Sequence, residues 1–299
     1  MKNAIIKVGF CVSYDWEMLK TSVPLVYTEA DTICFSIDKY RKTWNGQPYD
    51  FDEDAFRAWV TSVDPLNKIT ILEDEFSNTQ HTAIQNDNLQ RNAMGKAMGA
   101  GGWHIQIDAD EYFIDFPGFV QTLLAFNPSP TGQEKPVNFY CNLLPVIKRL
   151  EDGYLLAINE ENHETFPVAT NVPVYEYARR NGHFNHYTPF FVIHETWSRD
   201  EEQLWKKLNN WGHRDDFNLV SYFALWKTLD SFNYRFIRNF HPVEAAVWEK
   251  LEYFPAAGIG ALTGMLKNRS FQVPGSLVYL TKNSRVVQGL LHRVRKLKK

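Results

Sequence analysis

Hydrophobic positions in the first third of the chain alternate between the period of a buried strand and that of a helix with one apolar face. Continuous apolar runs at 7–13, 32–37 and 68–72 predict three buried strands. Between them, the apolar residues of 14–28 fall roughly on one side of a helix, and 53–63 fits a shorter helix. Strands that alternate with helices predict parallel pairing with right-handed crossovers, and therefore an α/β fold.

A further helix with a glycine-rich end precedes the next strand. Residues 82–98 place Leu89, Ala93 and Ala97 at a spacing of four on one face, which predicts a helix. Most of the following run, 99–102, is glycine, which commonly ends a helix. This block therefore predicts another helix-to-strand connection of the same kind.

The strand that follows, 103–113, ends in acidic residues. Ile105 and Ile107 alternate with polar residues until Asp108 and Asp110 interrupt the pattern. Residues two apart on an extended chain point to the same side, so these carboxylates can converge on one cation or on a ribose and diphosphate group. Ligands bind at the carboxyl ends of strands in open α/β sheets. A solvated acidic turn is the alternative interpretation.

Patterns in the middle of the chain are less regular. Residues 117–126 predict a helix. Residues 137–147 and 154–158 predict two strands joined by a hairpin turn at 151–153. Residues 160–187 show no clear period, so we expect a loop there.

A strand followed by a helix is predicted again around residue 200. Residues 190–193 form an apolar run, and Ser198 with Glu201 fits a capping box for the next helix. That helix is expected to end at Gly212, directly before His213.

The C-terminal part is expected to be helical and basic. Residues 242–251 predict a helix, and 285–299 combine basic residues with apolar positions and contain no acid. A helix of this kind can lie on an anionic membrane. A solvated basic tail is the alternative interpretation.

Composition is that of a soluble globular protein. The 299 residues allow about two domains, or one large α/β domain with an extension. The hydrophobic and charged fractions, 44% and 22%, are ordinary, and the net charge of −3 gives no reason to expect a nucleic-acid partner. Aromatic residues reach 15%, which suits stacking against sugar rings, although large cores also absorb aromatics.

Cysteine usage and the N-terminus indicate a cytoplasmic protein. Cys11, Cys34 and Cys141 lie in apolar runs without metal-ligand spacing, as expected of reduced, buried thiols. The N-terminus lacks the features of a signal peptide, and no apolar run approaches the length that spans a bilayer.

Two blocks of the sequence resemble a known family. The first, NLQRNAMGKAMGAGGWHIQIDADEYF at 88–113, is similar to the central block of glycosyltransferase family 2-like enzymes of the GT-A fold. The second, FFVIHETWSRDEEQLWKKLNNWGHRDDF, resembles a segment of the bacterial lipopolysaccharide and capsule members. Its matching residues, with those of the helix that follows, are His194, Glu195, His213, Tyr222 and Lys227. The resemblance covers about 7–227, most weakly at 39–80 and 127–189.

The resemblance implies a fold and a division of the chain. Residues 1–228 would form a GT-A domain, with a Rossmann-like, mixed and mainly parallel sheet flanked by helices. Residues 229–299 would form a mainly helical extension with a basic tail.

The resemblance also implies a site for a donor and a metal ion. Asp108 and Asp110 would bind the donor and Mn²⁺ or Mg²⁺, Asp110 directly and Asp108 through the ribose or a metal-bound water. His213 is the first choice to complete the metal shell and His194 the second, although a His at a helix end can also be a cap. Asp38 matches the residue that contacts the nucleotide, but the Ser-Thr-Asp-Thr type of turn that usually follows is missing.

Further residues could orient the donor or accept a proton. Arg91 either orients the donor diphosphate or holds the carboxylates. An inverting transfer needs a base for the acceptor hydroxyl, and Glu195 is the candidate, with Glu111 as the alternative. Glu195 could instead pair with Arg199.

The leading hypothesis is therefore a metal-dependent, inverting glycosyltransferase. It would move a sugar from a nucleotide donor, expected to be a UDP-sugar, to a surface polysaccharide or a lipid-linked glycan. It would act in the cytoplasm, with peripheral contact to the inner face of the membrane through 285–299. A catalytically silent nucleotide-sugar or glycan-binding protein of the same fold is the alternative. A metal-dependent phosphoesterase would require a denser ligand set.

Overall fold

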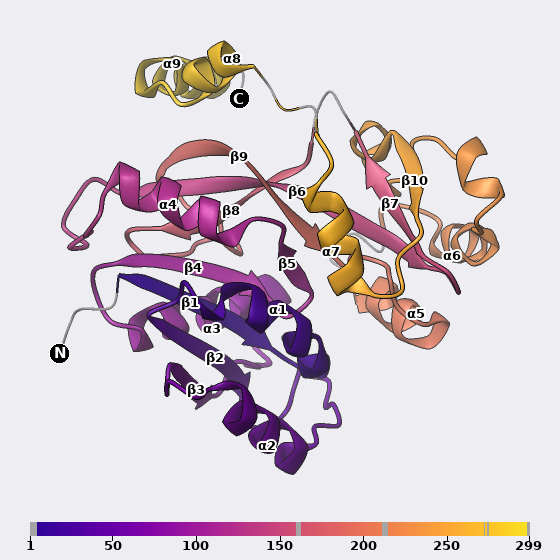
Figure 1. Ribbon diagram of the computed structural model, residues 1–299, viewed down its shortest axis with the longest axis horizontal. Coiled ribbons are helices and arrows are strands. Elements are labelled where there is room, and N and C mark those ends of the chain that lie inside the picture. Colours follow the sequence, from indigo (N-terminus) through magenta and orange to yellow (C-terminus); the bar gives the residue numbers. More distant parts are fainter. Residues whose placement is uncertain (1–4, 160–162, 211–214, 272, 274, 298–299) are drawn as a thin grey trace.

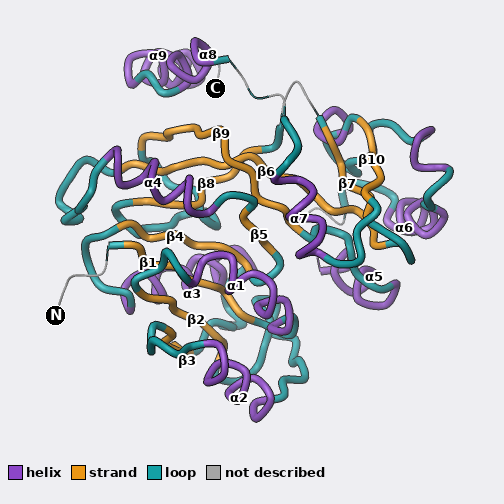
Figure 2. Tube along the Cα trace, in the orientation of Figure 1, coloured by secondary structure: helices purple, strands orange, loops and turns teal. Residues whose placement is uncertain are grey.

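The computed structural model describes residues 5–159, 163–210, 215–271, 273 and 275–297. These residues form a ten-stranded mixed sheet with helices packed against it (Figure 1). Eight strands follow one another across the sheet in the order β10 (Lys250–Phe254), β7 (Tyr154–Ile158), β6 (Val137–Arg149), β8 (Thr165–Thr170), β4 (Trp103–Asp108), β1 (Ile6–Val12), β2 (Thr32–Asp38) and β3 (Ile69–Asp74). The remaining strand pairs lie off this path: β9 (Phe184–His194) pairs with β6 and with β5 (Glu111–Phe113). Figure 2 shows the strands as a band that crosses the whole molecule. The predicted α/β class is confirmed.

The N-terminal part of the sheet is parallel, as predicted. β1 lies between β2 and β4 and pairs with both in parallel, and β3 extends the sheet beyond β2. Every residue of β1 is buried, which explains why its sequence is a continuous apolar run without alternation.

The sheet as a whole is not mainly parallel, which corrects the expectation. β8 is antiparallel to both β4 and β6, β7 is antiparallel to β6 and β10, and β5 is antiparallel to β9. Among the described strands from β5 to β10, only the β6–β9 pair is parallel. The β6–β7 hairpin forms at the predicted turn, and such turns join neighbouring strands in antiparallel order.

Helices form at most of the predicted positions. They are α1 (Leu19–Tyr27), α2 (Glu53–Val63), α3 (Ala83–Ala97), α4 (Phe116–Phe126), α5 (Glu201–Asn210), α6 (Leu219–Thr228), α7 (Ile259–Lys267), α8 (Ser276–Lys282) and α9 (Arg285–Leu297). A capping box between Thr82 and Gln85 begins α3. Gly99 follows its end with φ of 74°, a conformation that favours glycine, so the predicted glycine stop is confirmed.

Helices pack on both faces of the parallel strands. Phe10 of β1 belongs to the main core cluster, together with Leu19 of α1 and Phe119 of α4. On the other face, Cys11 packs with Met94 of α3. Gly9 permits this close approach, because a Cβ atom there would lie 2.7 Å from the sulfur of Met94.

The loop predicted at 160–187 is wrong, because β8 and the first part of β9 lie within it. β8 pairs with β4 and β6 along its two edges, and its last four residues are buried on both faces. A short strand covered on both faces has no polar and apolar alternation, so its period gives no signal.

Two further predictions, a helix at 242–251 and a capping box at Ser198, are also wrong. The helix expected at 242–251 is replaced by a 3-10 turn at Ala245–Trp248 and by β10, which pairs with β7. The capping box expected at Ser198 does not form. Asp200 accepts the backbone N–H of Gln203 at 2.7 Å, while the Ser198 side chain is buried.

The segment 229–299 contributes β10 to the sheet as well as α7, α8 and α9. In Figure 1, α8 and α9 lie at the upper edge of the molecule, and α8 contacts β9. The Asn283 side chain bonds to both the N–H and the C=O of Tyr187, at 2.7 and 3.0 Å. Within the described residues, no helix combines the length and the apolar character needed to cross a bilayer.

Candidate functional site

The carboxyl ends of β1, β2 and β4 lie at one edge of the sheet. The strand register places Cys11 beside Ser36 of β2 and beside Asp108 of β4. Because β2 and β4 flank β1 on opposite sides, this edge holds the switch point where open α/β sheets bind ligands. A cavity of about 350 Å³ opens here. Its lining includes Ser13, Tyr14, Asp15, Asp38, Lys42, Trp44, Gln90, Asp108, Asp110, His194, Arg199, Lys206 and Lys207.

Two arginines hold Asp108 at the end of β4. Arg91 of α3 donates to its Oδ1 at 2.8 Å, and Arg179 approaches its Oδ2 at 3.4 Å. Burial would raise the pKa of Asp108, but the charges of the two arginines outweigh it and hold the pKa below its usual range. Arg91 also pairs with Asp87 and does not line the cavity, so it holds a carboxylate, one of the two roles expected of it.

Glu111 is fixed behind the cavity. Its two oxygens accept from the two terminal nitrogens of Arg179, at 2.6 and 2.7 Å, and the backbone N–H of Asp108 donates to it at 3.0 Å. Glu111 is 1% exposed and does not line the cavity. The charged pair therefore positions the end of β4 and keeps Glu111 away from any ligand in the cavity.

Asp110 lies among three basic side chains. Its Oδ2 accepts from Arg199 at 2.8 Å and lies 3.5 Å from Nζ of Lys207, and its Oδ1 is 3.6 Å from Nε2 of His194. Burial alone would raise the pKa of Asp110, but Lys207, His194 and Arg199 together hold it well below its usual range. Asp110 is therefore an anion at neutral pH.

Asp15 and Arg199 extend this cluster across the cavity. Arg199 reaches Asp15 at 3.2 Å with the same nitrogen that it directs at Asp110. Burial raises the pKa of Asp15, and the Arg199 charge only partly opposes it. Burial also lowers the pKa of Lys207, and Arg199 adds to the shift. Burial therefore shifts the pKa values of Asp15 and Lys207 towards their neutral forms, while the ion pairs with Arg199 and Asp110 oppose the shifts.

Asp38 lines the cavity but is already engaged by the backbone. Its Oδ1 accepts the N–H groups of Tyr40 and Lys42, at 2.9 and 3.1 Å, and its Oδ2 accepts that of Phe76 at 2.8 Å. A carboxylate has about four acceptor positions, so roughly one is left for a ligand. Asp38 thus shapes the loop after β2 as well as facing the cavity.

Glu195 lies next to the cavity without lining it. Its backbone N–H donates to the carbonyl of Asp110 at 3.0 Å, and its Oε1 accepts the hydroxyl of Tyr112 at 2.6 Å. Burial raises the pKa of Glu195, and the Tyr112 hydrogen bond offsets part of the rise. Arg199, its alternative partner, pairs instead with Asp15 and Asp110.

The structure describes three of the four residues expected in the metal shell. Asp110 and His194 face each other, whereas His213 lies outside the described residues. Among the residues that the structure describes, no group of three or more His, Cys, Asp or Glu side chains gathers as the ligands of one ion would.

Sequence reasoning missed the basic half of this site. Arg179 comes from a segment expected to be a loop, Lys207 comes from α5, and Arg199 was considered only as a partner of Glu195, whereas all three lie beside the carboxylates of β4 or the turn after it. Asp15 had an available signal, because it follows the end of β1 by three residues, and carboxylates also stand at the ends of β2 and β4.

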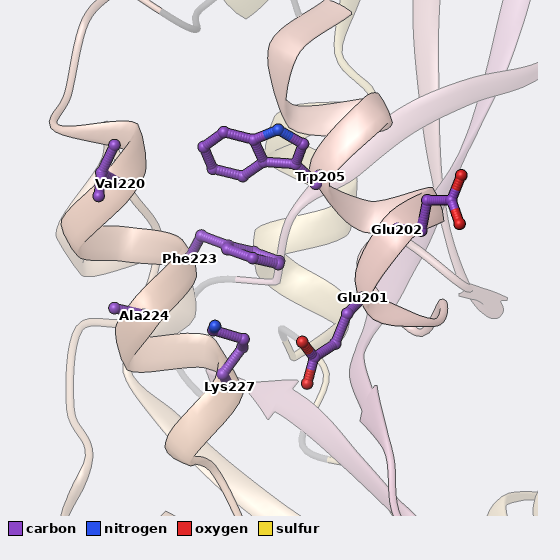
Figure 3. Close-up of a pocket in the computed structure, with 7 residues that line it drawn as sticks. All are labelled: Glu201, Glu202, Trp205, Val220, Phe223, Ala224 and Lys227. Carbon is purple, nitrogen blue, oxygen red and sulfur yellow. The ribbon is translucent and has the colours of Figure 1, made fainter.

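A second cavity, of about 420 Å³, lies between α5 and α6 (Figure 3). Its lining consists of Glu201, Glu202 and Trp205 from α5 and of Val220, Phe223, Ala224 and Lys227 from α6. Lys227, which the family resemblance singled out, thus lies in this groove and not in the cavity at the sheet edge.

Comparisons with known proteins give little beyond this geometry. No family model matches the chain, and no curated protein does. Among solved structures, it is similar to the crystal structure of S. aureus TarS 1-349, with a TM-score of 0.31 and 9% identity. The match covers 46% of this chain and 36% of that one. A likeness this slight transfers no function.

Proposed function

We propose that this chain is a GT-A type glycosyltransferase. It binds a nucleoside-diphosphate sugar, with UDP-sugars as the first choice, and transfers the sugar to a surface polysaccharide or lipid-linked glycan. One observation carries the proposal: Asp108 and Asp110 share a cavity at the switch point of the sheet with Asp38 and the aromatic side chains of Tyr14 and Trp44. The cavity volume lies at the lower end of the range of small-molecule sites, roughly 300–1,000 Å³.

The charge balance of the cavity supports a divalent ion. Four carboxylates (Asp15, Asp38, Asp108, Asp110) and four cations (Lys42, Arg199, Lys206, Lys207) line it, so its formal charge is zero. A neutral cavity gives a dianionic diphosphate no net attraction, whereas one divalent ion would match the charge of the ligand.

We assign that ion, Mn²⁺ or Mg²⁺, to Asp110 and His194, with Asp108 nearby. The facing Oδ1 and Nε2 atoms provide an oxygen and an imidazole donor, and the carboxylate oxygen is the type of ligand that suits Mn²⁺ and Mg²⁺. Mg²⁺ usually takes only one or two carboxylates from a protein and completes its shell with phosphates and water. When bound, the ion would supply stabilisation of negative charge on the departing phosphate. His213 stays a prediction as a further ligand.

Protein groups perform the remaining steps of this proposal. Arg199 and Lys207 fix the orientation of Asp110, and Arg91 with Arg179 fixes that of Asp108. We assign the base to Glu195 and not to Glu111, because both oxygens of Glu111 are bonded to Arg179.

A binding protein without transferase activity is the second candidate. One observation favours it: neither Glu195 nor Glu111 lines the cavity that would hold the donor. The two candidates share donor binding and differ in turnover, so they separate when binding and product formation are measured on the same protein.

We expect a nucleotide sugar to stabilise the protein in a Mn²⁺-dependent manner. A ligand at a hundredfold excess over its Kd adds about 2.7 kcal/mol to the free energy of unfolding. The measurement is a thermal-shift screen of UDP- and GDP-sugars with and without Mn²⁺, with Mn²⁺ alone and UMP as controls. If no nucleotide sugar shifts the melting temperature, the donor site is refuted. A shift without release of nucleoside diphosphate in the presence of glycan acceptors would favour the binding protein.

The C-terminal segment provides the basis for membrane contact. After Glu252 the chain contains nine Lys and Arg residues and no acid. Leu277 and Leu280 of α8 and Val286 and Leu290 of α9 are all more than half exposed. Apolar side chains interleaved with cations suit the surface of an anionic bilayer, so we propose that α8 and α9 bind such a surface.

Replacing Leu277 and Leu290 together by serine should lower partitioning onto phosphatidylglycerol vesicles by about tenfold or more, because two apolar side chains lose their burial in lipid. Vesicle co-sedimentation measures the partitioning. Leu66→Ser is the matched control, since Leu66 is 65% exposed in another part of the chain. Equal binding of the double variant, or failure of the unmodified protein to bind these vesicles, would contradict the proposal.

A further inference from the structure

The groove between α5 and α6 presents a fixed aromatic surface to solvent. Trp205 is 38% exposed, and its ring centroid lies 5.0 Å from that of Phe223. Phe223 in turn stacks on Trp226, with an angle of 7° between the ring planes. Trp226 is buried and donates its indole N–H to the carbonyl of Ile147 at 2.7 Å. The exposed rings are thus supported from below by the core.

Polar side chains border these rings. Figure 3 shows Glu201 of α5 and Lys227 of α6 below the Phe223 ring and Trp205 above it. Nζ of Lys227 lies 5.2 Å from the centroid of the Phe223 ring. A carboxylate accepts hydroxyl protons and an ammonium group donates to hydroxyl oxygens, while an aromatic face packs against an apolar face. A sugar ring offers both kinds of surface, because its C–H groups and its hydroxyls point in different directions.

Helix α5 connects this groove to the cavity at the sheet edge. Lys206 and Lys207 line that cavity, whereas Glu201 and Trp205 line the groove. The two spaces therefore lie on different sides of one helix, whose diameter is about 10 Å. A chain of a few sugar units held in the groove could place its end near the cavity.

We propose that the α5–α6 groove binds a segment of a neutral oligosaccharide, with Trp205 as the stacking platform. The role of that oligosaccharide as the acceptor rests on the proposed function, but its binding does not. The mixed charge of the groove, with carboxylates and one lysine, favours a neutral saccharide over a strongly charged one.

The test measures saccharide binding to the full chain without donor or metal. The probes are chitotetraose, cellotetraose and mannotetraose, followed by saturation-transfer NMR and titration. At least one probe should bind, and Trp205→Ala should raise its Kd by about tenfold, the upper range for the loss of one aromatic stacking contact. Phe236→Ala is the matched control, because Phe236 is an exposed aromatic outside the groove, and it should leave Kd unchanged.

Each outcome decides the proposal. Unchanged affinity in a folded Trp205→Ala variant, or binding of none of the three probes, would overturn it. Phe223→Leu keeps an apolar side chain under Trp205 and serves as a second variant, with weaker binding expected, if Trp205→Ala fails to fold. Saccharide binding without any donor-induced thermal shift would refute the proposed transferase and leave the groove intact. Transfer with saccharide affinity independent of Trp205 would refute only the groove.

Discussion

Asp110→Asn is expected to lower the rate of sugar transfer about a thousandfold or more while the protein stays folded. Asparagine keeps the size of the side chain but removes the negative charge that pairs with Arg199 and Lys207 and that would bind the divalent ion. Loss of one group that stabilises transition-state charge typically costs roughly a hundredfold to a thousandfold, and loss of a metal ligand adds to this. Donor hydrolysis and transfer, measured with saturating Mn²⁺, report the effect.

The matched control is Asp74→Asn. Asp74 ends β3 at the same edge of the sheet, is exposed and does not line the cavity, so its change should leave the rate unaltered. Circular dichroism and the melting temperature check the fold of both variants. If Asp110→Asn retains full activity, or if Asp74→Asn loses as much, the cavity is not the transfer site.

Elements whose own residues carry a clear pattern could be predicted from the sequence. β1 and β2 appear as continuous apolar runs, and α3 ends at the predicted glycine stop. The face of α3 that was predicted to be apolar is not the buried one, because Leu89 is 38% exposed and the buried face carries polar side chains such as Gln90 and Arg91. β8 and β10 escaped because their strand character depends on partners distant in the chain. β8 fits between β4 and β6, and β10 pairs with β7, whose residues lie 92 to 100 positions earlier.

The site likewise combines residues from one short segment, which could be predicted, with residues from distant segments, which could not. Asp108 and Asp110 could be placed at the sheet edge because both the carboxylates and the strand that carries them lie in one short segment. Their basic partners lie far along the chain. Arg179 is 71 residues from Asp108, and Arg199 and Lys207 are 89 and 97 residues from Asp110. Nothing in the local pattern around an arginine indicates which distant carboxylate it meets after folding.

The second large effect on the transfer rate is expected when Glu195 is replaced. As the base it must be ionised, and burial raises its pKa from an ordinary value of 4.5. The ionised fraction, and with it kcat/KM, should therefore rise with pH along an acid limb that lies above the usual range of glutamate. Glu195→Gln should lower kcat by about a hundredfold to ten-thousandfold and abolish this limb. Initial rates across a pH series measure both.

The stability of the Glu195→Gln variant distinguishes a catalytic base from a residue that only supports the fold. Because the pKa of Glu195 is higher in the folded than in the unfolded chain, the folded state binds the proton more tightly, and stability falls as pH rises from the unfolded to the folded pKa. Glutamine is neutral and retains an oxygen for the Tyr112 hydroxyl, so the variant should be at least as stable at neutral pH. A stable, inactive variant fits the base, whereas an unstable one fits a structural role.

Tyr112→Phe tests the same assignment without removing the carboxyl group. The Tyr112 hydroxyl donates to Glu195 at 2.6 Å and lowers its pKa, so its loss should move the acid limb of kcat/KM to higher pH. The rate at alkaline pH, where Glu195 is ionised in either protein, should recover towards that of the unmodified enzyme. An acid limb that stays in place in Tyr112→Phe, or that survives in Glu195→Gln, would show that another group accepts the proton.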